Sequence, residues 1–491
     1  MDDRALQDRA REVLKSQFGF SDYRGEQEQV VLAALRGQSS LVMMPTGMGK
    51  SLCYQLPSTL LKGTTLVISP LIALMQDQVN KAQQMDLRAS FINSSLNSRQ
   101  RQERLEKLKK GAYQLFYVTP ERFRSSEFVE IITQVQVPLL AVDEAHCISQ
   151  WGHDFRPDYS RLGGIRQQLG RPPTMALTAT ATAEVRQDIL NQLDLSADSC
   201  MEFKAGVLRP NLYVEVLSLQ SWEEKLTALV GLHHHQPGPM IVYFMLISTL
   251  EKTAQALRQI GVEVLVYHGQ LPDSLRRRNQ DRFIAGEGDL ILATPAFGLG
   301  VDKPDVRSVV HMELPGSIEA YYQEIGRAGR DSQPARTTLL YDGDDISIPM
   351  DFIKWSHPDP GFVRALYNLL VGQKDKVRAE GADYLRTQMN FYNRRDFRVE
   401  TALNQLDSLG VISWPHKDFR KIDVVADFPE EAFSEQGHRD HLLAQNKKLL
   451  KLVQLVQSQQ CLKRQIYAYF DPETEFLDCG FCGVCGGWSS L

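Results

Sequence analysis

Short runs of apolar and β-branched residues alternate with longer segments of helical periodicity as far as residue 341. The runs lie at residues 41–44, 65–69, 115–118, 139–142 and 175–177, and the rhythm restarts at 240–244, 262–267, 290–294, 306–312 and 337–341. Strands that alternate with helices are typical of a parallel, doubly wound sheet. We therefore predict two tandem α/β domains with a boundary near residues 205–215.

The pattern changes after Trp355. Helical periods run over residues 361–370, 382–391 and 397–409, and a turn at Gly410 leads to two short strand-like runs at 411–414 and 422–425. Three helices closed by a hairpin favour a small α+β module of the winged-helix kind. A polar helix at 439–457 then leads to a tail that carries four cysteines. We expect domains at residues 1–208, 209–350, 351–430 and 431–491.

Composition and charge narrow the function classes. The chain is 43% hydrophobic and 23% charged, as an ordinary globular protein is. A net charge of −5 excludes a surface that is basic throughout, so any nucleic-acid contact must use local patches. Residues 81–110 carry eight Lys or Arg against three acids, which a solvated helix face explains equally well. Arg394, Arg395 and Arg398 begin the expected third helix, where a winged helix contacts phosphate or a groove.

The chain offers no signal for secretion or membrane insertion. Its N-terminus is charged and lacks the apolar run of a secretion signal, and its longest apolar stretches are too short to span a bilayer. We expect a cytoplasmic protein that does not bind membranes and that is nucleoid-associated if the source is bacterial.

A glycine-bearing loop follows the first apolar run directly and leads into a helix start. It consists of Pro45, Thr46, Gly47, Met48, Gly49, Lys50 and Ser51. Glycines at these positions let backbone amides turn inward on phosphate oxygens, Lys50 reaches the β and γ phosphates, and Ser51 can ligate magnesium. The sequence therefore predicts a P-loop that binds ATP and Mg²⁺, with Thr46, Gly47, Met48 and Gly49 in the nucleotide site.

Two carboxylates follow the run at 139–142. Asp143 and Glu144 begin an Asp-Glu-Ala-His string that ends at His146. Ligands of a parallel sheet bind at the carboxyl edge where this string lies. Asp143 would hold magnesium, and Glu144 would polarise the attacking water, as phosphoryl transfer requires. We count His146 with them as a catalytic candidate.

Four cysteines gather near the C-terminus, at Cys461, Cys479, Cys482 and Cys485. Seven cysteines in 491 residues are too few for a disulfide scaffold. The C-x2-C-x2-C knuckle places three sulfurs on one loop, and Cys461 supplies the fourth, so the pattern predicts structural zinc, with an iron–sulfur cluster as the alternative. The other three cysteines are dispersed and are expected in cores.

Residues 147–159, Cys-Ile-Ser-Gln-Trp-Gly-His-Asp-Phe-Arg-Pro-Asp-Tyr, directly follow the Asp-Glu-Ala-His string. This segment resembles the aromatic-rich loop of the RecQ family of DNA helicases. Segments at 18–27, 69–75, 93–95, 117–122, 176–181, 267–269, 293–304 and 321–330 follow in the order of that family's motifs. The resemblance covers about residues 15 to 345.

The resemblance implies two tandem RecA-like P-loop domains, at 1–208 and 209–350, followed by the winged helix and the zinc-binding module. It implies that Phe20, Arg24 and Gln27 read adenine, and it places Gln323, Arg327 and Arg330 in the catalytic set. Two arginines three apart on one helix face can reach the γ phosphate, and Arg330 is by resemblance the arginine finger.

The expected partners are single-stranded and duplex DNA. Bases of a single strand can stack on Trp151, His153 and Phe155 beside Arg156, at about 1–3 kcal/mol per base. The family implies translocation 3′ to 5′ and a role in repair or recombination. Partner proteins are not indicated by the sequence.

Several features leave alternatives open. The Asp-Glu-Ala-His box also occurs in RNA helicases, and a DNA-remodelling ATPase without strand separation would carry the same motifs. Departures from the family pattern at 244–246, Pro295 and Asp302 affect the expected strand contacts of the second lobe. The zinc module follows the winged helix instead of preceding it, as in a shorter RecQ-like branch, and no further nucleic-acid module is expected after it. We infer that the hairpin near residues 414–419 acts as a wedge that separates the strands.

Overall fold

The computed structural model describes residues 3–70, 72–93, 96–149, 156–196, 198–204, 206–298, 303–390 and 396–488. The chain divides into two compact units. The first unit comprises Met1–Glu313, Glu319–Asp342 and Leu455–Leu491, and the second comprises Leu314–Ile318 and Gly343–Gln454. The first unit therefore holds both α/β lobes together with the cysteine-bearing tail, and the second holds the helices and the hairpin.

The first lobe is built on a parallel sheet that, within the described residues, has seven strands in the order β3-β4-β2-β5-β6-β1-β7. Its strands are β1 (Ser39–Met43), β2 (Thr65–Ile68), β3 (Ala89–Ile92), β4 (Leu115–Val118), β5 (Leu140–Val142), β6 (Thr174–Thr178) and β7 (Cys200–Lys204). The five runs predicted for this lobe are confirmed as strands, and β3 and β7 were not predicted.

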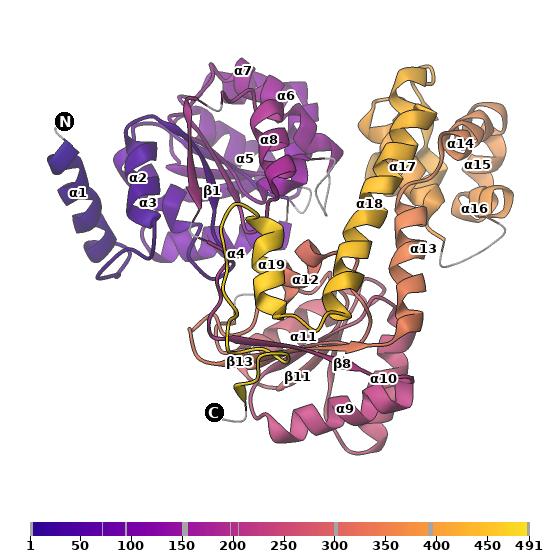
Figure 1. The fold of residues 1–491 in the computed structure, drawn as a ribbon. Coiled ribbons are helices and arrows are strands. Elements are labelled where there is room, and N and C mark those ends of the chain that lie inside the picture. The colour runs from indigo at the N-terminus through magenta and orange to yellow at the C-terminus, as the bar shows by residue number, and fades with distance from the viewer. Residues whose placement is uncertain are drawn as a thin grey trace. The chain divides into compact units, whose positions relative to one another are not determined.

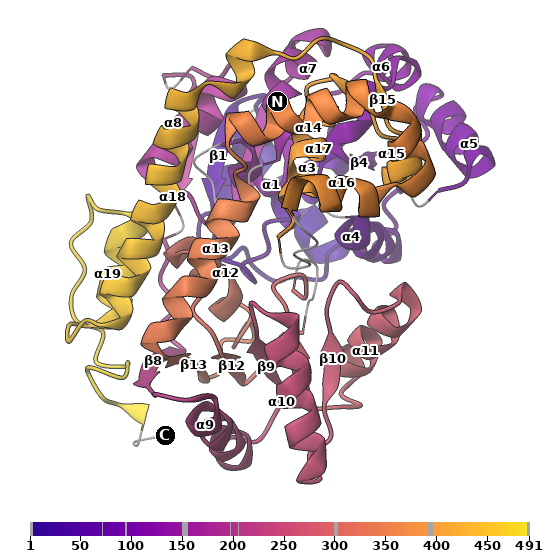
Figure 2. The ribbon, with the colours of Figure 1, turned by 90° about the vertical axis from the view of Figure 1, so that its right-hand side faces the viewer.

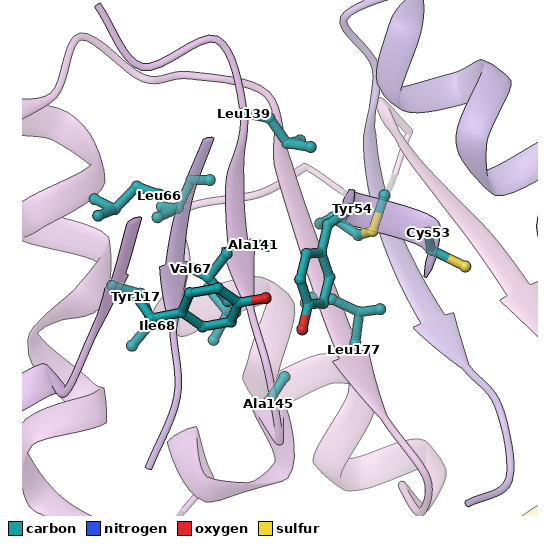
Figure 3. Close-up of a cluster of buried hydrophobic side chains, with 14 of the residues drawn as sticks. Cys53, Tyr54, Leu66, Val67, Ile68, Tyr117, Leu139, Ala141, Ala145 and Leu177 are labelled. Atoms are coloured by element: carbon teal, nitrogen blue, oxygen red, sulfur yellow. The ribbon is translucent and has the colours of Figure 1, made fainter. Parts of the chain in front are cut away.

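Helices pack on this sheet (Figure 1). They are α2 (Gln27–Leu35), α3 (Leu52–Leu60), α4 (Ile72–Gln84), α5 (Ser98–Lys109), α6 (Ser126–Thr133), α7 (Leu162–Gln168) and α8 (Ala183–Gln192), and α1 (Asp3–Ser16) packs outside them against α2 and α3. The helix that follows the P-loop, α3, is buried from Leu52 to Ser58. Its Tyr54 meets Tyr117 of β4 edge to face, with ring centroids 6.3 Å apart (Figure 3). This packing fixes the start of α3, and with it the end of the P-loop, on the sheet.

The second lobe repeats the plan with a described sheet of six parallel strands in the order β10-β11-β9-β12-β13-β8. The strands are β8 (Leu212–Ser218), β9 (Met240–Tyr243), β10 (Leu265–Tyr267), β11 (Leu290–Ala293), β12 (Ser308–His311) and β13 (Ala335–Tyr341). Its helices are α9 (Trp222–His235), α10 (Ile247–Gln259), α11 (Asp273–Ala285) and α12 (Ile318–Ile325). The five predicted runs all hold strands, and β8 was not predicted.

The second unit is helical apart from one hairpin. It contains α13 (Ser347–Ser356), α14 (Pro360–Gly372), α15 (Lys374–Glu380), α16 (Ala382–Asn390), α17 (Arg398–Ser408), β14 (Ile412–Ser413), β15 (Asp423–Val424) and α18 (Glu435–Val456). The long helix α18 runs beside α13, as Figures 1 and 2 both show. Helices and an antiparallel pair lie where we expected them, with α13 and α15 in addition. Their assignment as a winged helix stays a prediction.

The hairpin of this unit directs its aromatic side chains inward. Trp414 is 6% exposed and packs against Phe419, with ring centroids 5.0 Å apart. Both belong to the apolar core formed by α14, α16 and α17. The aromatic pair around which we inferred a strand-separating wedge therefore stabilises the unit's own core.

The cysteine-bearing tail contains a short helix, α19 (Leu462–Phe470), and returns to the second lobe. Cys482 forms a parallel bridge with Val214 of β8, and the Gly483 amide donates to the Val214 carbonyl oxygen over 2.8 Å. In the described parts of the chain, no helix is both long enough and apolar enough to cross a membrane.

Candidate nucleotide site and cysteine centre

Three neighbouring strands of the first lobe end at one edge of the sheet. β6 pairs with β1 on one side and with β5 on the other, all in parallel. The P-loop follows β1, Asp143 and Glu144 follow β5, and Thr178 ends β6. Because carboxyl ends of parallel strands share one edge, the fold brings the predicted phosphate loop and the predicted carboxylates together.

The P-loop has the backbone that its glycines permit. Gly47 and Gly49 have φ angles of +85° and +79°, in the left-handed region that other residues adopt at a cost. Lys50 donates from Nζ to the carbonyl oxygen of Met44, 3.1 Å away, so its ammonium lies against the mouth of the loop. Ser51 follows at the start of α3. All the predicted P-loop residues are thus contiguous at one end of β1.

Gln27 holds this loop from the side. The Gln27 side chain is buried, and its Nε2 donates to the carbonyl oxygens of Met48 and Gly49 over 2.8 and 3.2 Å. Its Oε1 accepts from the amide of Arg24 over 2.8 Å. Phe20, 43% exposed, and the exposed Arg24 lie on the segment before α2. An exposed ring and an exposed guanidinium beside the P-loop suit the stacking of a flat base.

The two carboxylates lie close to His146 and Thr178 at this edge of the sheet. Asp143 Oδ1 accepts from the Glu144 amide over 3.0 Å, and Glu144 Oε2 lies 3.4 Å from Nδ1 of His146. The same Nδ1 lies 3.0 Å from Oγ1 of Thr178, which donates to the carbonyl oxygen of Thr180. Glu144 has a φ of +48°, a left-handed conformation that is uncommon for a residue with a side chain and that costs free energy.

Asp143 is in an environment that favours a cation next to it. Burial, and next the neighbouring Glu144 carboxylate, raise the pKa of Asp143 to about 7, while Lys50 acts in the opposite direction. A buried carboxylate beside a second carboxylate is stabilised when a positive charge binds. The residues present therefore suit a hard divalent ion.

The segment that follows the Asp-Glu-Ala-His string is tied back to it. Trp151, His153 and Phe155, predicted to stack on DNA, lie outside the described residues. Arg156 is described and donates from Nη1 to the Pro70 carbonyl oxygen over 2.9 Å. Tyr159, fully buried, donates from its hydroxyl to the Asp143 carbonyl oxygen over 3.2 Å. The end of this loop thus contacts the backbone of a predicted catalytic residue.

The two arginines of the second lobe do not lie on a helix, contrary to our expectation. α12, which carries Gln323, ends at Ile325, and the following residues form turns. Within these turns Gly329 has a left-handed φ of +56°, and a Cβ at Gly326 would lie 2.6 Å from Oγ1 of Thr46. Thr46 Oγ1 donates to the Gly326 carbonyl oxygen over 2.9 Å. This arginine turn, residues 326–330, therefore meets the P-loop directly.

Each arginine of the turn has a close glycine neighbour. Arg327 donates from Nη1 to the carbonyl oxygen of Gly298, and a Cβ on that glycine would overlap the guanidinium. A Cβ at Gly47 would lie 2.9 Å from Cγ of Arg330. The predicted arginine finger, Arg330, thus lies beside the predicted P-loop, and it fits there because Gly47 has no side chain.

The four predicted metal ligands converge. The sulfur atoms of Cys461, Cys479, Cys482 and Cys485 all lie within 4.8 Å of one another. A tetrahedral site with metal–sulfur bonds of about 2.3 Å has sulfurs about 3.8 Å apart. Backbone amides donate to three of the sulfurs, as they do in thiolate sites, including that of Cys485 to Cys482 over 3.4 Å. The donor set fits zinc.

Arg209 was missed by our reading of the sequence. It lies at the predicted boundary between the lobes, and its side chain contacts the arginine turn. A single arginine before a proline belongs to no periodic pattern and to no motif with a fixed ligand spacing. The local sequence therefore does not distinguish Arg209 from other arginines.

Two parallel α/β lobes, with a P-loop and paired carboxylates on the first and an arginine turn on the second, are the arrangement of the two-lobed class of helicases. Family models agree: DEAD/DEAH box helicase matches residues 24–189, helicase conserved C-terminal domain matches 223–332, and RecQ zinc-binding matches 417–486. The solved structure of Mycobacterium smegmatis helicase Lhr bound to ssDNA and AMP-PNP has a similar fold. Its TM-score is 0.55 at 18% identity, over 81% of this chain and 57% of that one.

Curated proteins of similar sequence indicate which family of helicases the chain resembles. ATP-dependent DNA helicase RecQ of Bacillus subtilis (strain 168) is 42% identical over 71% of this chain and 58% of its own length. Probable ATP-dependent DNA helicase RecS of the same organism is 36% identical over 96% of this chain and 90% of its own length. The chain belongs to the RecQ family of helicases. It spans little more than half the length of the RecQ relatives that it matches.

The family and the described residues together support two cofactors. The helicase models support ATP, and the zinc-binding model together with the cysteine cluster supports zinc.

Proposed function

We propose that this protein is an ATP-driven DNA helicase that translocates 3′ to 5′ on one strand and separates duplex DNA in repair or recombination. The observation that carries the proposal is the convergence of Lys50, Asp143 and Glu144 at one sheet edge, with the arginine turn against the P-loop. Its relatives are named as DNA helicases. A cytoplasmic location stays a prediction from the sequence.

In this proposal each residue has a defined task. Lys50 leaves the Met44 carbonyl to bind the β and γ phosphates, and Glu144 orients the attacking water. Arg330 contacts the γ phosphate, with Arg327 beside it. Magnesium, held by Ser51 and through water by Asp143, would neutralise phosphate charge; the raised pKa of the buried Asp143 is the observation that favours a cation there.

We propose that DNA is sensed through the loop that follows the Asp-Glu-Ala-His string. A base stacked on Trp151 or Phe155 would shift this loop, and the bond from the Tyr159 hydroxyl to the Asp143 carbonyl would pass the shift to the carboxylates. His146 offers a second connection, because its Nδ1 lies within reach of both Glu144 and Thr178.

The test is the steady-state ATPase rate without nucleic acid, with single-stranded DNA and with single-stranded RNA. DNA should stimulate the wild type strongly, RNA should not, and Trp151→Ala should lose most of the stimulation. Tyr159→Phe, which keeps the ring and removes one hydrogen bond, should lose part of it. Equal stimulation by RNA would favour an RNA-directed enzyme. Stimulation that is indifferent to both substitutions would remove the proposed coupling.

A further inference from the structure

Arg209 is a buried arginine whose side chain binds only backbone carbonyl oxygens in the described part of the chain. It is 8% exposed. Its Nη1 donates to Gly326 over 3.1 Å, and its Nη2 donates to Ala328 over 2.6 Å and to Gly329 over 3.1 Å. Three of the five carbonyls of the arginine turn are therefore fixed by one guanidinium.

The same guanidinium also reaches the P-loop. Nη1 lies 3.5 Å from the Thr46 carbonyl oxygen, and Thr46 Oγ1 donates to the Gly326 carbonyl oxygen that Arg209 already contacts. The planar fork of an arginine can bind several oxygens in a fixed geometry, which a lysine ammonium cannot do. Arg209 thus sets the distance between the backbone that carries Arg327 and Arg330 and the loop that precedes Lys50.

The backbone of Arg209 is held from the opposite side by α19. The Arg209 amide donates to the Tyr467 hydroxyl over 3.1 Å. Lys463 donates from Nζ to the carbonyl oxygens of Arg209, Pro210 and Leu212 over 3.3, 3.2 and 3.0 Å. The segment 209–212 is therefore fixed between the arginine turn and the helix that follows Cys461.

We propose that Arg209 is a positioning residue for ATP hydrolysis: it holds the arginine turn where Arg330 can contact the γ phosphate, and α19 holds Arg209. This inference rests on the proposed ATPase. Burial lowers the pKa of Arg209, so keeping this charge inside has a cost. A residue that only linked the arginine turn to the P-loop would not need a buried charge. Binding several carbonyl oxygens in one plane requires the guanidinium of an arginine.

The experiment replaces Arg209 with lysine and compares it with Arg166→Lys. Arg166 is also 8% exposed and also donates to neutral oxygens, those of Thr174 and Asp194, but it lies in the first lobe on α7. Three quantities are measured on the full chain: DNA-stimulated kcat, affinity for fluorescent ADP, and affinity for ADP with aluminium fluoride, a mimic of the transferring phosphoryl group. The last reports the placement of the finger and does not depend on turnover.

Arg209→Lys should lower kcat and the affinity for ADP–aluminium fluoride by about tenfold or more, and leave ADP affinity within about threefold of the wild type. Arg166→Lys should leave all three within about threefold. Equal losses of ADP and ADP–aluminium fluoride affinity, or equal behaviour of the two variants, would overturn the inference. A wild type without ATPase activity would instead overturn the proposed function, so the two failures are distinguishable.

Tyr467→Phe tests the same inference if Arg209→Lys does not fold. It removes only the hydroxyl that accepts from the Arg209 amide and keeps the ring in place. The inference predicts a smaller loss of the same kind, with ADP–aluminium fluoride affinity reduced and ADP affinity kept. Unchanged affinity for both ligands in Tyr467→Phe would overturn the inference that Arg209, held by α19, positions the arginine turn.

Discussion

Replacing Gly49 with alanine tests whether the P-loop backbone and Gln27 together set nucleotide affinity. The φ of +79° at Gly49 makes any Cβ unfavourable, at about 1–2 kcal/mol. The new Cβ would also lie 2.7 Å from Nε2 of Gln27, which is buried and donates to Met48 and Gly49. Displacing that amide from its two acceptors adds about 1–2 kcal/mol.

The two terms sum to about 2–4 kcal/mol, which is about 30- to 1000-fold in affinity if the whole cost appears in the bound state. The whole cost appears on binding when the free Gly49→Ala loop relaxes away from this conformation and the bound loop, whose amides face phosphate, does not. The assay is titration with fluorescent ADP.

Gly111→Ala is the matched control, because Gly111 has a φ of +67° in the same lobe and a Cβ there would meet nothing within 4 Å. It should leave ADP affinity within about twofold of the wild type, since its backbone cost is the same in both states. ADP affinity within the same range for Gly49→Ala would refute the reasoning.

Three further outcomes are expected. Glu144→Gln should lower kcat by about 100-fold or more and keep ADP affinity, because the amide cannot orient water as a carboxylate does; loss of ADP binding would contradict this. Cys482→Ser should release zinc and lower the melting temperature, whereas Cys200→Ser, outside the cluster, should keep one zinc per chain by colorimetric titration. Burial, and next the His357 ring at 4.3 Å, lower the pKa of His441 to about 4. The neutral His441 therefore stabilises the folded protein above the pKa of an unfolded histidine, about 6.5, and this contribution is lost as the pH decreases toward 4. His441→Gln should flatten this fall in a thermal melt, and exposed His234→Gln should not.

The hydrophobic pattern predicted both sheets because their central strands are buried on both faces and therefore read as continuous apolar runs. β7 was missed because only two of its five residues are buried. β8 was missed in part because Glu215 interrupts its apolar run. The structure shows why that carboxylate is tolerated: it accepts from Arg336 over 2.6 and 2.9 Å and from Thr338 over 2.6 Å.

The nucleotide and cysteine sites could be predicted because their ligands follow short, fixed spacings. What the spacing could not supply was the backbone between elements. The arginine turn was expected on a helix because Arg327 and Arg330 are three apart, but α12 ends at Ile325, and Gly329 then adopts a left-handed φ of +56°. Arg209 acts over more than a hundred residues of separation, and no local pattern encodes such a contact.

The most direct test of the motor is unwinding of a labelled DNA duplex that carries a single-stranded tail at either its 3′ or its 5′ end. We predict ATP-dependent strand release from the 3′-tailed duplex, little from the 5′-tailed one, and none in either case with Glu144→Gln. Release from the 5′-tailed duplex alone would contradict the polarity. DNA-stimulated hydrolysis without release from either duplex would contradict strand separation and leave a DNA-remodelling ATPase in its place.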